Sequence, residues 1–186
     1  MQQTNQLANP GPLGLMGFGM TTVLLNLHNV GLFPVVSVIL AMGIFYGGLA
    51  QLIAGILEYR RGNTFAATAF TSYGCFWLSL VTIWLLPALG LAEATSHGFM
   101  GWYLFLWGLF TLGLYVGTRH KGPKMLRVVF ATLTVLFFLL ALRDWTGSTF
   151  IGTIAGLVGI FCGLCAMYLS VAEVLHAHTG KSVLPY

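Results

Sequence analysis

The chain has 186 residues, of which 58% are hydrophobic and only 6% are charged. This leaves too little polar surface to cover a water-soluble globule, so the composition excludes a soluble domain and predicts an integral membrane protein. The formal net charge is +4; because the cations flank apolar runs, we attribute it to contact with lipid headgroups and expect no nucleic-acid partner.

Several apolar segments are long enough to cross the hydrocarbon core of a membrane, which takes about 20 residues of helix. Polar or proline-containing breaks separate them, and no internal repeat or linker is evident. We therefore predict an all-α integral membrane protein with six transmembrane helices, forming a single domain over residues 1–186. The predicted spans are 12–31, 35–58, 65–90, 99–118, 125–142 and 149–175.

The distribution of positive charge predicts the orientation of the chain. An even number of spans places both termini on one face, and all the Lys and Arg residues except Arg143 fall on that face. An excess of cations in short loops marks the cytoplasm, so we expect both termini there and a multi-pass protein of the inner (plasma) membrane. Apart from Arg127, which lies at the edge of the fifth predicted span, no Lys or Arg lies inside a span, and this argues against fixed-charge binding of a multivalent anion.

The first predicted span opens on two prolines within residues 9–12, where the missing N–H groups have no intrahelical partner to lose. Phe18, Thr22, Asn26 and Asn29 follow at steps of four, four and three, so they share one helix face. A polar stripe that faces lipid is costly. The stripe therefore faces either a neighbouring helix, where polar groups join helices, or a wet path.

The second predicted span carries Gln51 and Glu58, which are seven residues apart and so share a helix face. Arg60 or Arg61 is close enough to pair with Glu58, which leaves a boundary ion pair and a direct part in solute passage both open. Gln51 lies deeper. An amide can donate to a carboxylate without carrying a charge, so Gln51 is a candidate for weak, reversible contact with an anion.

Hydroxyl and thiol groups form a stripe along the third predicted span, with Tyr73 beside it. Such a stripe is typical of one wall of a path, although hydroxyls also bond to carbonyls of their own helix. The sequence does not separate these two interpretations. The members of the stripe are Thr64, Thr68, Ser72, Cys75, Ser79 and Thr82.

Glycines at steps of four in the second and sixth spans, among them Gly43, Gly47, Gly159 and Gly163, predict close packing of helices, either within one subunit or between subunits.

Cys162 and Cys165 form a C-x-x-C within the last predicted span. Redox activity would need a nearby cation or helix N-terminus to favour the thiolate, and no charged residue lies within two turns, so we interpret them as packing residues. The sequence contains no metal-ligand spacing, phosphate loop or nucleophile elbow. We therefore predict no metal, no cofactor and no enzyme activity.

The opening motif is specific to a known family. Asn9-Pro10-Gly11-Pro12-Leu13-Gly14-Leu15, followed by Gly17-Phe18, resembles the signature of the acetate uptake transporter family, whose bacterial members include the succinate–acetate permease. The resemblance covers nearly the whole chain and departs at Gly11, where the family more usually has alanine. It continues through residues 42–48, 51–59, 70–77 and 133–137.

The resemblance implies a six-helix protomer that assembles as a ring-shaped homohexamer. Each protomer would have its own path for acetate and related small carboxylates such as propionate, with succinate in some members. Carried onto this sequence, the family's apolar constriction would consist of Phe18, Tyr73 and Leu133. Whether a proton travels with the solute stays open.

A carboxylate loses its hydration at mid-membrane, and amides and hydroxyls must replace that water step by step. An apolar ring would reject hydrated ions by size and dewetting, and would admit a short acid whose methyl group tolerates apolar walls. The candidate polar groups of the path are Asn9, Thr22, Asn26, Gln51, Glu58, Thr68 and Ser72.

The leading hypothesis is therefore a small-carboxylate permease or channel. One alternative is a non-transporting membrane scaffold or sensor, whose polar and glycine faces only join subunits. Another is a membrane thiol oxidoreductase that uses Cys162 and Cys165.

Overall fold

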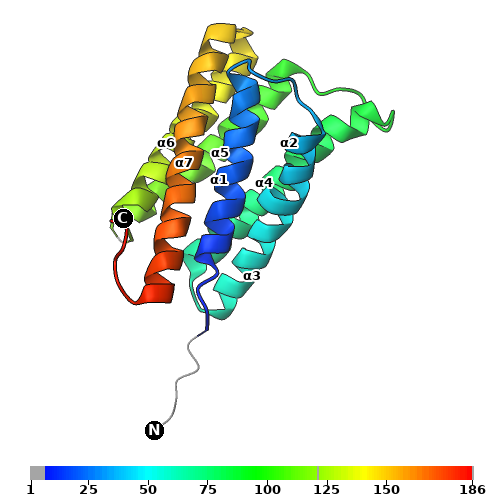
Figure 1. The fold of residues 1–186 in the computed structure, drawn as a ribbon. Coiled ribbons are helices and arrows are strands. Elements are labelled where there is room, and N and C mark those ends of the chain that lie inside the picture. Colours follow the sequence, from blue (N-terminus) through cyan, green and yellow to red (C-terminus); the bar gives the residue numbers. More distant parts are fainter. Residues whose placement is uncertain (1–6, 121, 186) are drawn as a thin grey trace.

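The structure is a computed structural model that describes residues 7–120 and 122–185, and within these ranges it contains helices and no strand. The helices form one bundle in which α1 packs between α7 and the α2–η1–α3 segment (Figure 1). The beginning of α1 and the end of α7 lie at the same end of the bundle, called the termini end below. The helices are α1 (Gly11–Asn29), α2 (Ser37–Met42), η1 (Gly43–Ala50), α3 (Gln51–Arg60), α4 (Thr64–Ala88), α5 (His97–Thr118), α6 (Lys124–Thr146) and α7 (Thr149–Thr179).

Five helical segments are long and apolar enough to cross a membrane: Ser37–Arg60, Thr64–Ala88, His97–Thr118, Lys124–Thr146 and Thr149–Thr179. The prediction of an all-α membrane protein is confirmed at this level. Helix α1 has 19 residues and is not among the five. Six spans therefore remain a prediction.

The fifth predicted span ends at residue 142, which placed Arg143 and Asp144 in the turn before the sixth span, and this prediction was wrong. Helix α6 continues to Thr146 and ends at Gly147, whose φ of +67° lies in the left-handed region that glycine adopts most easily. Arg143 and Asp144 therefore lie inside the last turns of α6.

The second predicted span is one helical run, but its middle third, η1, is a π-helix. Wider π turns displace backbone carbonyls from their usual partners and often occur at functional sites. The hydroxyl of Thr21 on α1 donates to the carbonyl of Met42, directly before η1, at 3.4 Å. Gln51 is the first residue after η1.

Helices α1 and α7 approach so closely that their backbones touch at glycines. A methyl group on Gly19 would lie 2.7 Å from the carbonyl oxygen of Gly163, and one on Gly163 would lie 2.7 Å from the carbonyl oxygen of Gly19. Only glycine fits at both positions. At this contact the predicted glycine packing joins two helices of the same chain.

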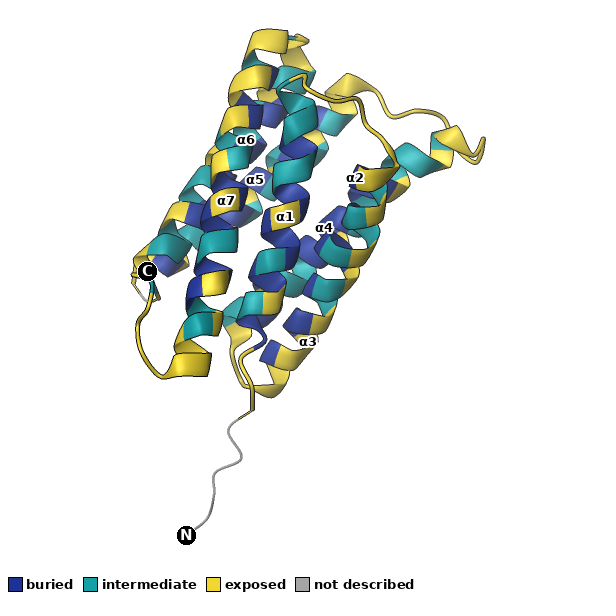
Figure 2. Ribbon diagram, viewed as in Figure 1, coloured by how far each residue is buried: buried dark blue, intermediate teal, exposed yellow. Residues whose placement is uncertain are grey.

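The outer surface of the helices carries many apolar side chains. Exposed residues follow the outer faces of the helices, whereas buried residues face the centre of the bundle (Figure 2). Large hydrophobic side chains are exposed along most helices, including Phe45, Leu106 and Phe161. This surface is suited to lipid or to neighbouring subunits rather than to water.

We expect Gly163→Ala to lower the free energy of unfolding by about 1–3 kcal/mol, because the new methyl group meets a backbone carbonyl that cannot turn aside. The matched control is Gly113→Ala on α5, where a methyl group meets no atom of the described chain within 4 Å. Thermal unfolding of both variants in the same detergent measures the difference. Equal midpoints would show that the α1–α7 contact is less tight than described.

Candidate functional site

Two cavities enter the bundle from opposite ends. The termini-side cavity has a volume of about 820 Å³ and is lined by residues of α1, α3, α4, α5, α6 and α7. The distal cavity, of about 380 Å³, is lined from the opposite end by residues such as His28, Asn29 and Arg143. No residue lines both cavities.

A hydrogen-bonded polar cluster lines the termini-side cavity, and we call it the mouth cluster: Asn9, Glu58, Arg61, Asn63 and Glu173. Arg61 donates to the Asn9 amide oxygen at 2.7 Å and pairs with Glu58 at 3.2 Å. Asn9 donates to Glu173 at 3.0 Å, and Asn63 donates to Glu58 at 3.0 Å. The boundary ion pair weighed for Glu58 is therefore formed with Arg61, and it also faces the cavity.

The local backbone explains why these groups meet. Gly62 has a φ of +72° and reverses the chain after α3, which brings the Asn63 backbone N–H to the carbonyl of Glu58 at 3.1 Å. The Asn9 amide oxygen also accepts from the backbone N–H of Gly11 at 3.1 Å, which fixes its side chain at the start of α1. Glu58 is only 1% exposed, so removing its partners would leave a polar group buried without hydrogen bonds.

Gln51 lies deeper in the same cavity and is 1% exposed. Its side-chain oxygen is buried without a hydrogen-bond partner among the described residues. An unpartnered amide in a buried position is costly. A polar group at this depth is therefore ready to bind a solute or water that enters the cavity.

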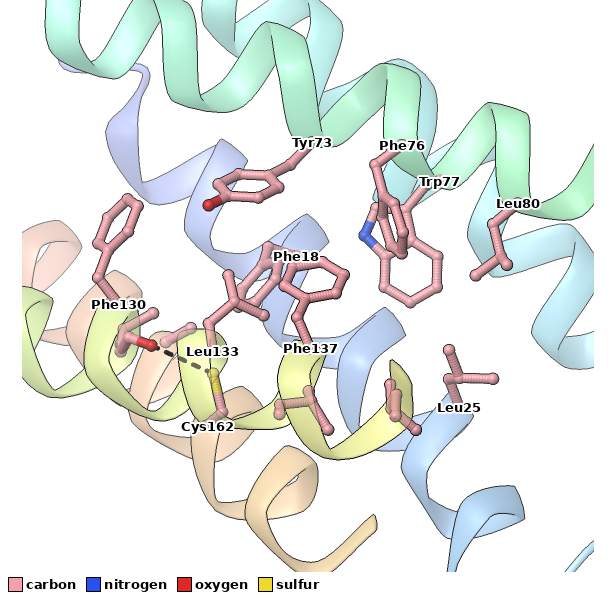
Figure 3. Packing of buried hydrophobic residues seen from close by; sticks show 14 of the residues in the cluster. Phe18, Leu25, Tyr73, Phe76, Trp77, Leu80, Phe130, Leu133, Phe137 and Cys162 are labelled. Carbon is pink, nitrogen blue, oxygen red and sulfur yellow. Dashed lines mark hydrogen bonds between the residues drawn. The ribbon is translucent and has the colours of Figure 1, made fainter. Parts of the chain in front are cut away.

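The predicted constriction residues Phe18, Tyr73 and Leu133 all line the termini-side cavity, and their side chains gather near the centre of the bundle (Figure 3). The rings of Phe18 and Tyr73 are 6.0 Å apart between centroids, tilted by 44°. The Tyr73 hydroxyl is 2.9 Å from that of Thr111, which holds the ring in place. The three residues are thus brought together.

A second apolar layer continues this group toward the distal cavity, which Phe76 lines. The rings of Phe76 and Phe137 pack edge to face with centroids 5.1 Å apart. We call Phe18, Tyr73, Phe76, Leu133 and Phe137 together the apolar plug. Each of them is at most 6% exposed, so the plug separates the two cavities with close-packed side chains.

Four predicted path residues, Thr22, Asn26, Thr68 and Ser72, line neither cavity. Thr68 is exposed and Ser72 is half-buried. Asn26 donates to the Thr22 carbonyl at 2.8 Å, and its amide packs so closely on Gly159 that a methyl group there would overlap it. For Asn26 the geometry favours the alternative of a group that joins helices.

Most of the hydroxyl stripe on α4 also fails to reach the cavities; Thr64 alone of its members lines one. Ser79 donates to the Phe76 carbonyl at 2.9 Å, and Thr82 donates to the Leu78 carbonyl at 2.7 Å. These hydroxyls bond to their own helix, as the second interpretation of the stripe held.

The cysteines are all free, and Cys162 and Cys165 are buried among apolar residues. The Cys162 thiol lies 3.5 Å from the carbonyl of Val129 on α6. Across the described parts of the chain, His, Cys, Asp and Glu side chains form no group of three that could hold a metal ion.

Three residues were missed as functional candidates at the level of the sequence: Asn63, Phe76 and Phe137. Asn63 had no usable signal before the Gly62 turn was known. Phe76 and Phe137 are indistinguishable in sequence from other aromatic core residues, whereas Glu173 gave a signal, because it is an acidic residue near the end of an apolar span.

Comparison with known proteins gives consistent results. The family model described as "GPR1/FUN34/yaaH family" matches residues 1–185. The succinate-acetate/proton symporter SatP of Escherichia coli K12 is 59% identical over 180 residues, which cover 97% of this chain and 95% of that protein. An uncharacterized protein of Methanothermobacter thermautotrophicus is 51% identical over 189 residues, covering 98% of this chain and 92% of that protein. A solved structure of the bacterial acetate channel SatP matches with a TM-score of 0.95 and 59% identity, covering 97% of this chain and 99% of that one.

We expect Arg61→Met to lower the free energy of unfolding by about 1–3 kcal/mol, because the buried Glu58 loses its cation and Asn9 loses a donor. Arg60→Met is the matched control, since Arg60 is exposed and lines neither cavity. Denaturation of both variants in detergent measures the effect. The mouth cluster would contribute nothing to stability if the two variants unfolded alike.

Proposed function

The chain belongs to the GPR1/FUN34/yaaH family, and we propose that it carries acetate across the membrane along a path through the two cavities and the apolar plug of each chain. The observation that carries this proposal is the pair of cavities, which enter the bundle from opposite ends with the apolar plug between them. The unpartnered side-chain oxygen of Gln51 lines the larger cavity.

Membership also decides several of the broader predictions. The chain is a multi-pass transport protein of the inner membrane, and it is not an enzyme. The resemblance seen in the opening motif is confirmed. This excludes the alternative of a thiol oxidoreductase.

The mechanism follows from the cost of dehydrating a carboxylate. In the termini-side cavity Arg61 and the amides of Asn9 and Asn63 supply donors near the entrance, while Glu58 and Glu173 limit the attraction so that the anion is not trapped. Deeper in, the Gln51 side-chain nitrogen donates to the carboxylate as water is lost, while the unpartnered Gln51 oxygen accepts from water that accompanies the anion. Weak, successive contacts of this kind permit both entry and release.

The plug acts as the selectivity barrier. Phe18, Tyr73 and Leu133 offer no hydrogen bond to a hydrated ion except the Tyr73 hydroxyl, which is already engaged by Thr111. A methyl group is tolerated between apolar side chains, so a short acid passes when the rings move apart. Propionate and succinate enter the same path, and larger acids meet a steeper steric barrier.

The finer topology is also part of this proposal. Helix α1 is a further span, which brings the number to six, and α7 and η1 shield it from lipid. Both termini are cytoplasmic, since four cations gather at the termini end: Arg60, Arg61, Lys124 and Arg127. The single domain covers residues 1–186. Six copies form a ring, their exposed apolar faces in contact with one another and with lipid, and each copy keeps its own path.

A non-transporting scaffold is less well supported by the geometry. A scaffold needs its polar groups to be satisfied at helix contacts, as Asn26 is, since it bonds to the Thr22 carbonyl of its own helix and packs on Gly159 of α7. The larger cavity instead reaches the centre of the bundle, where the Gln51 oxygen is left without a partner.

Uptake of labelled acetate into proteoliposomes tests the function directly, with protein-free liposomes as the control. We expect uptake that depends on the protein and, if a proton accompanies acetate, a rise when an inward proton gradient is imposed. Uptake no faster than in protein-free liposomes would exclude transport and favour the scaffold.

We expect Phe18→Ala and Tyr73→Ala to widen the plug and to raise the flux of butyrate relative to acetate, because each removes a ring from the barrier. Phe99→Ala is the control, since Phe99 is 72% exposed and lines neither cavity. The measurement is competitive uptake of the two labelled acids. Unchanged flux and selectivity in both plug variants would place the barrier elsewhere.

We expect Gln51→Leu to lower acetate uptake about tenfold or more, since losing a hydrogen bond to a charged group costs about 1.5–3 kcal/mol. Thr153→Val removes a polar group from the exposed side of α7 and is the control. If Gln51→Leu transports acetate at the wild-type rate, the amide makes no contact with the passing anion.

A further inference from the structure

We propose that Arg143 forms an anion-binding site in the distal cavity, where it captures a small monocarboxylate before it reaches the plug. This inference rests on the proposed function, and it gives that function a recruiting residue at the end of the bundle away from the termini. The sequence analysis excluded fixed positive charge from the spans, but the structure places this arginine within α6 and on the wall of a cavity.

The position of Arg143 is fixed by two contacts. Its aliphatic part lies on Gly152 of α7, where a methyl group would come within 3.2 Å of Cδ and 3.3 Å of Nε. Its guanidinium donates through Nη1 to the side-chain oxygen of Asn29 on α1 at 3.2 Å. A glycine on one helix and an amide on another thus hold the side chain at the cavity wall.

The polar stripe of α1 supports this arrangement. Asn29 donates to the Asn26 side-chain oxygen at 3.0 Å, and Asn26 donates to the Thr22 carbonyl at 2.8 Å. Because each amide donates to the next group toward the centre of the bundle, the Asn29 oxygen is left facing Arg143 as an acceptor. The stripe that the sequence placed on a helix contact or a wet path therefore serves to position the arginine.

Most of the hydrogen-bonding capacity of Arg143 is left for a ligand. A guanidinium has five N–H donors, and the bond to Asn29 uses one of them. Within the described ranges Arg143 makes no ion pair with a carboxylate. Asp144 lines the same cavity, but the ion-pair partner found for it is His97, at 3.5 Å.

The remaining lining defines the ligand class. A guanidinium stays charged at all physiological pH values and matches a carboxylate with two parallel hydrogen bonds. Below it, Leu25, Phe76 and Leu104 give the cavity an apolar floor that suits a short alkyl group. These features together select a small monocarboxylate, with its head on Arg143 and its tail toward the plug.

The test compares Arg143→Gln with Arg127→Gln, which removes the same charge from the opposite end of α6 at a position that lines neither cavity. Saturation of acetate uptake from the distal side into oriented proteoliposomes is measured at low and high salt. We expect Arg143→Gln to raise KM about tenfold with little change in the maximal rate, and to weaken the salt dependence, because electrostatic capture in a cleft raises association by about 10-fold or more. Arg143→Lys should restore KM part of the way to the wild-type value, because it keeps the positive charge. An unchanged KM and salt dependence would overturn the proposal while leaving transport itself intact.

A second measurement does not depend on transport. Trp84 also lines the distal cavity, so its fluorescence, taken as the difference between the wild-type chain and the Trp84→Phe variant, reports on anions there. We expect iodide to quench this signal several-fold less in Arg143→Gln than in the wild-type background, and acrylamide, which is neutral, to quench both equally. Equal quenching by iodide in the wild-type and Arg143→Gln backgrounds would show that Arg143 forms no anion site. If wild-type proteoliposomes failed to take up acetate, this result would still decide whether the anion site exists.

Discussion

In the transport that we propose, the close-packed apolar plug at the middle of the bundle is the barrier on which the rest of the structure depends. Phe76 and Phe137 pack edge to face at 5.1 Å, Phe18 and Tyr73 lie 6.0 Å apart, and none of the plug residues is more than 6% exposed. A hydrated ion finds no replacement for its water in such a contact. In the proposed transport, the polar groups of the two cavities bring a carboxylate up to this barrier and receive it on the other side.

Close helix contacts at glycines and a π-helix lie next to the plug and the cavities. Glycines on α1 and α7 bring the two backbones together, which positions Phe18 against the ring of Tyr73 on α4. Gln51, the first residue after the π-helix η1, lines the termini-side cavity together with the plug residues Phe18 and Tyr73. On the far side, Asn29 and Gly152 hold Arg143 at the wall of the distal cavity. Helix packing and solute contact thus depend on the same few positions.

Sequence reasoning was most successful where a physical constraint acts along one helix. Long apolar runs and charged breaks predicted the helices, and the opening motif predicted the family and the grouping of Phe18 with Tyr73 and Leu133. It was least successful where side chains of different helices meet. Thr68 and Ser72 have suitable chemistry, but rotation of α4 directs them away from both cavities. Arg143 seemed to belong to a loop, because one additional turn of α6 cannot be read from composition.

The claim that acetate passes through the plug can be tested by blocking the plug covalently. In a chain whose native cysteines Cys75, Cys162 and Cys165 are replaced by alanine, Leu133→Cys provides a single thiol within the barrier. Treatment with a methanethiosulfonate reagent adds a bulky group there, and labelled acetate uptake is then measured against the extent of modification. If acetate passes through the plug, uptake falls in proportion to the modified fraction. Full modification with uptake at the unmodified rate would show that the path lies elsewhere.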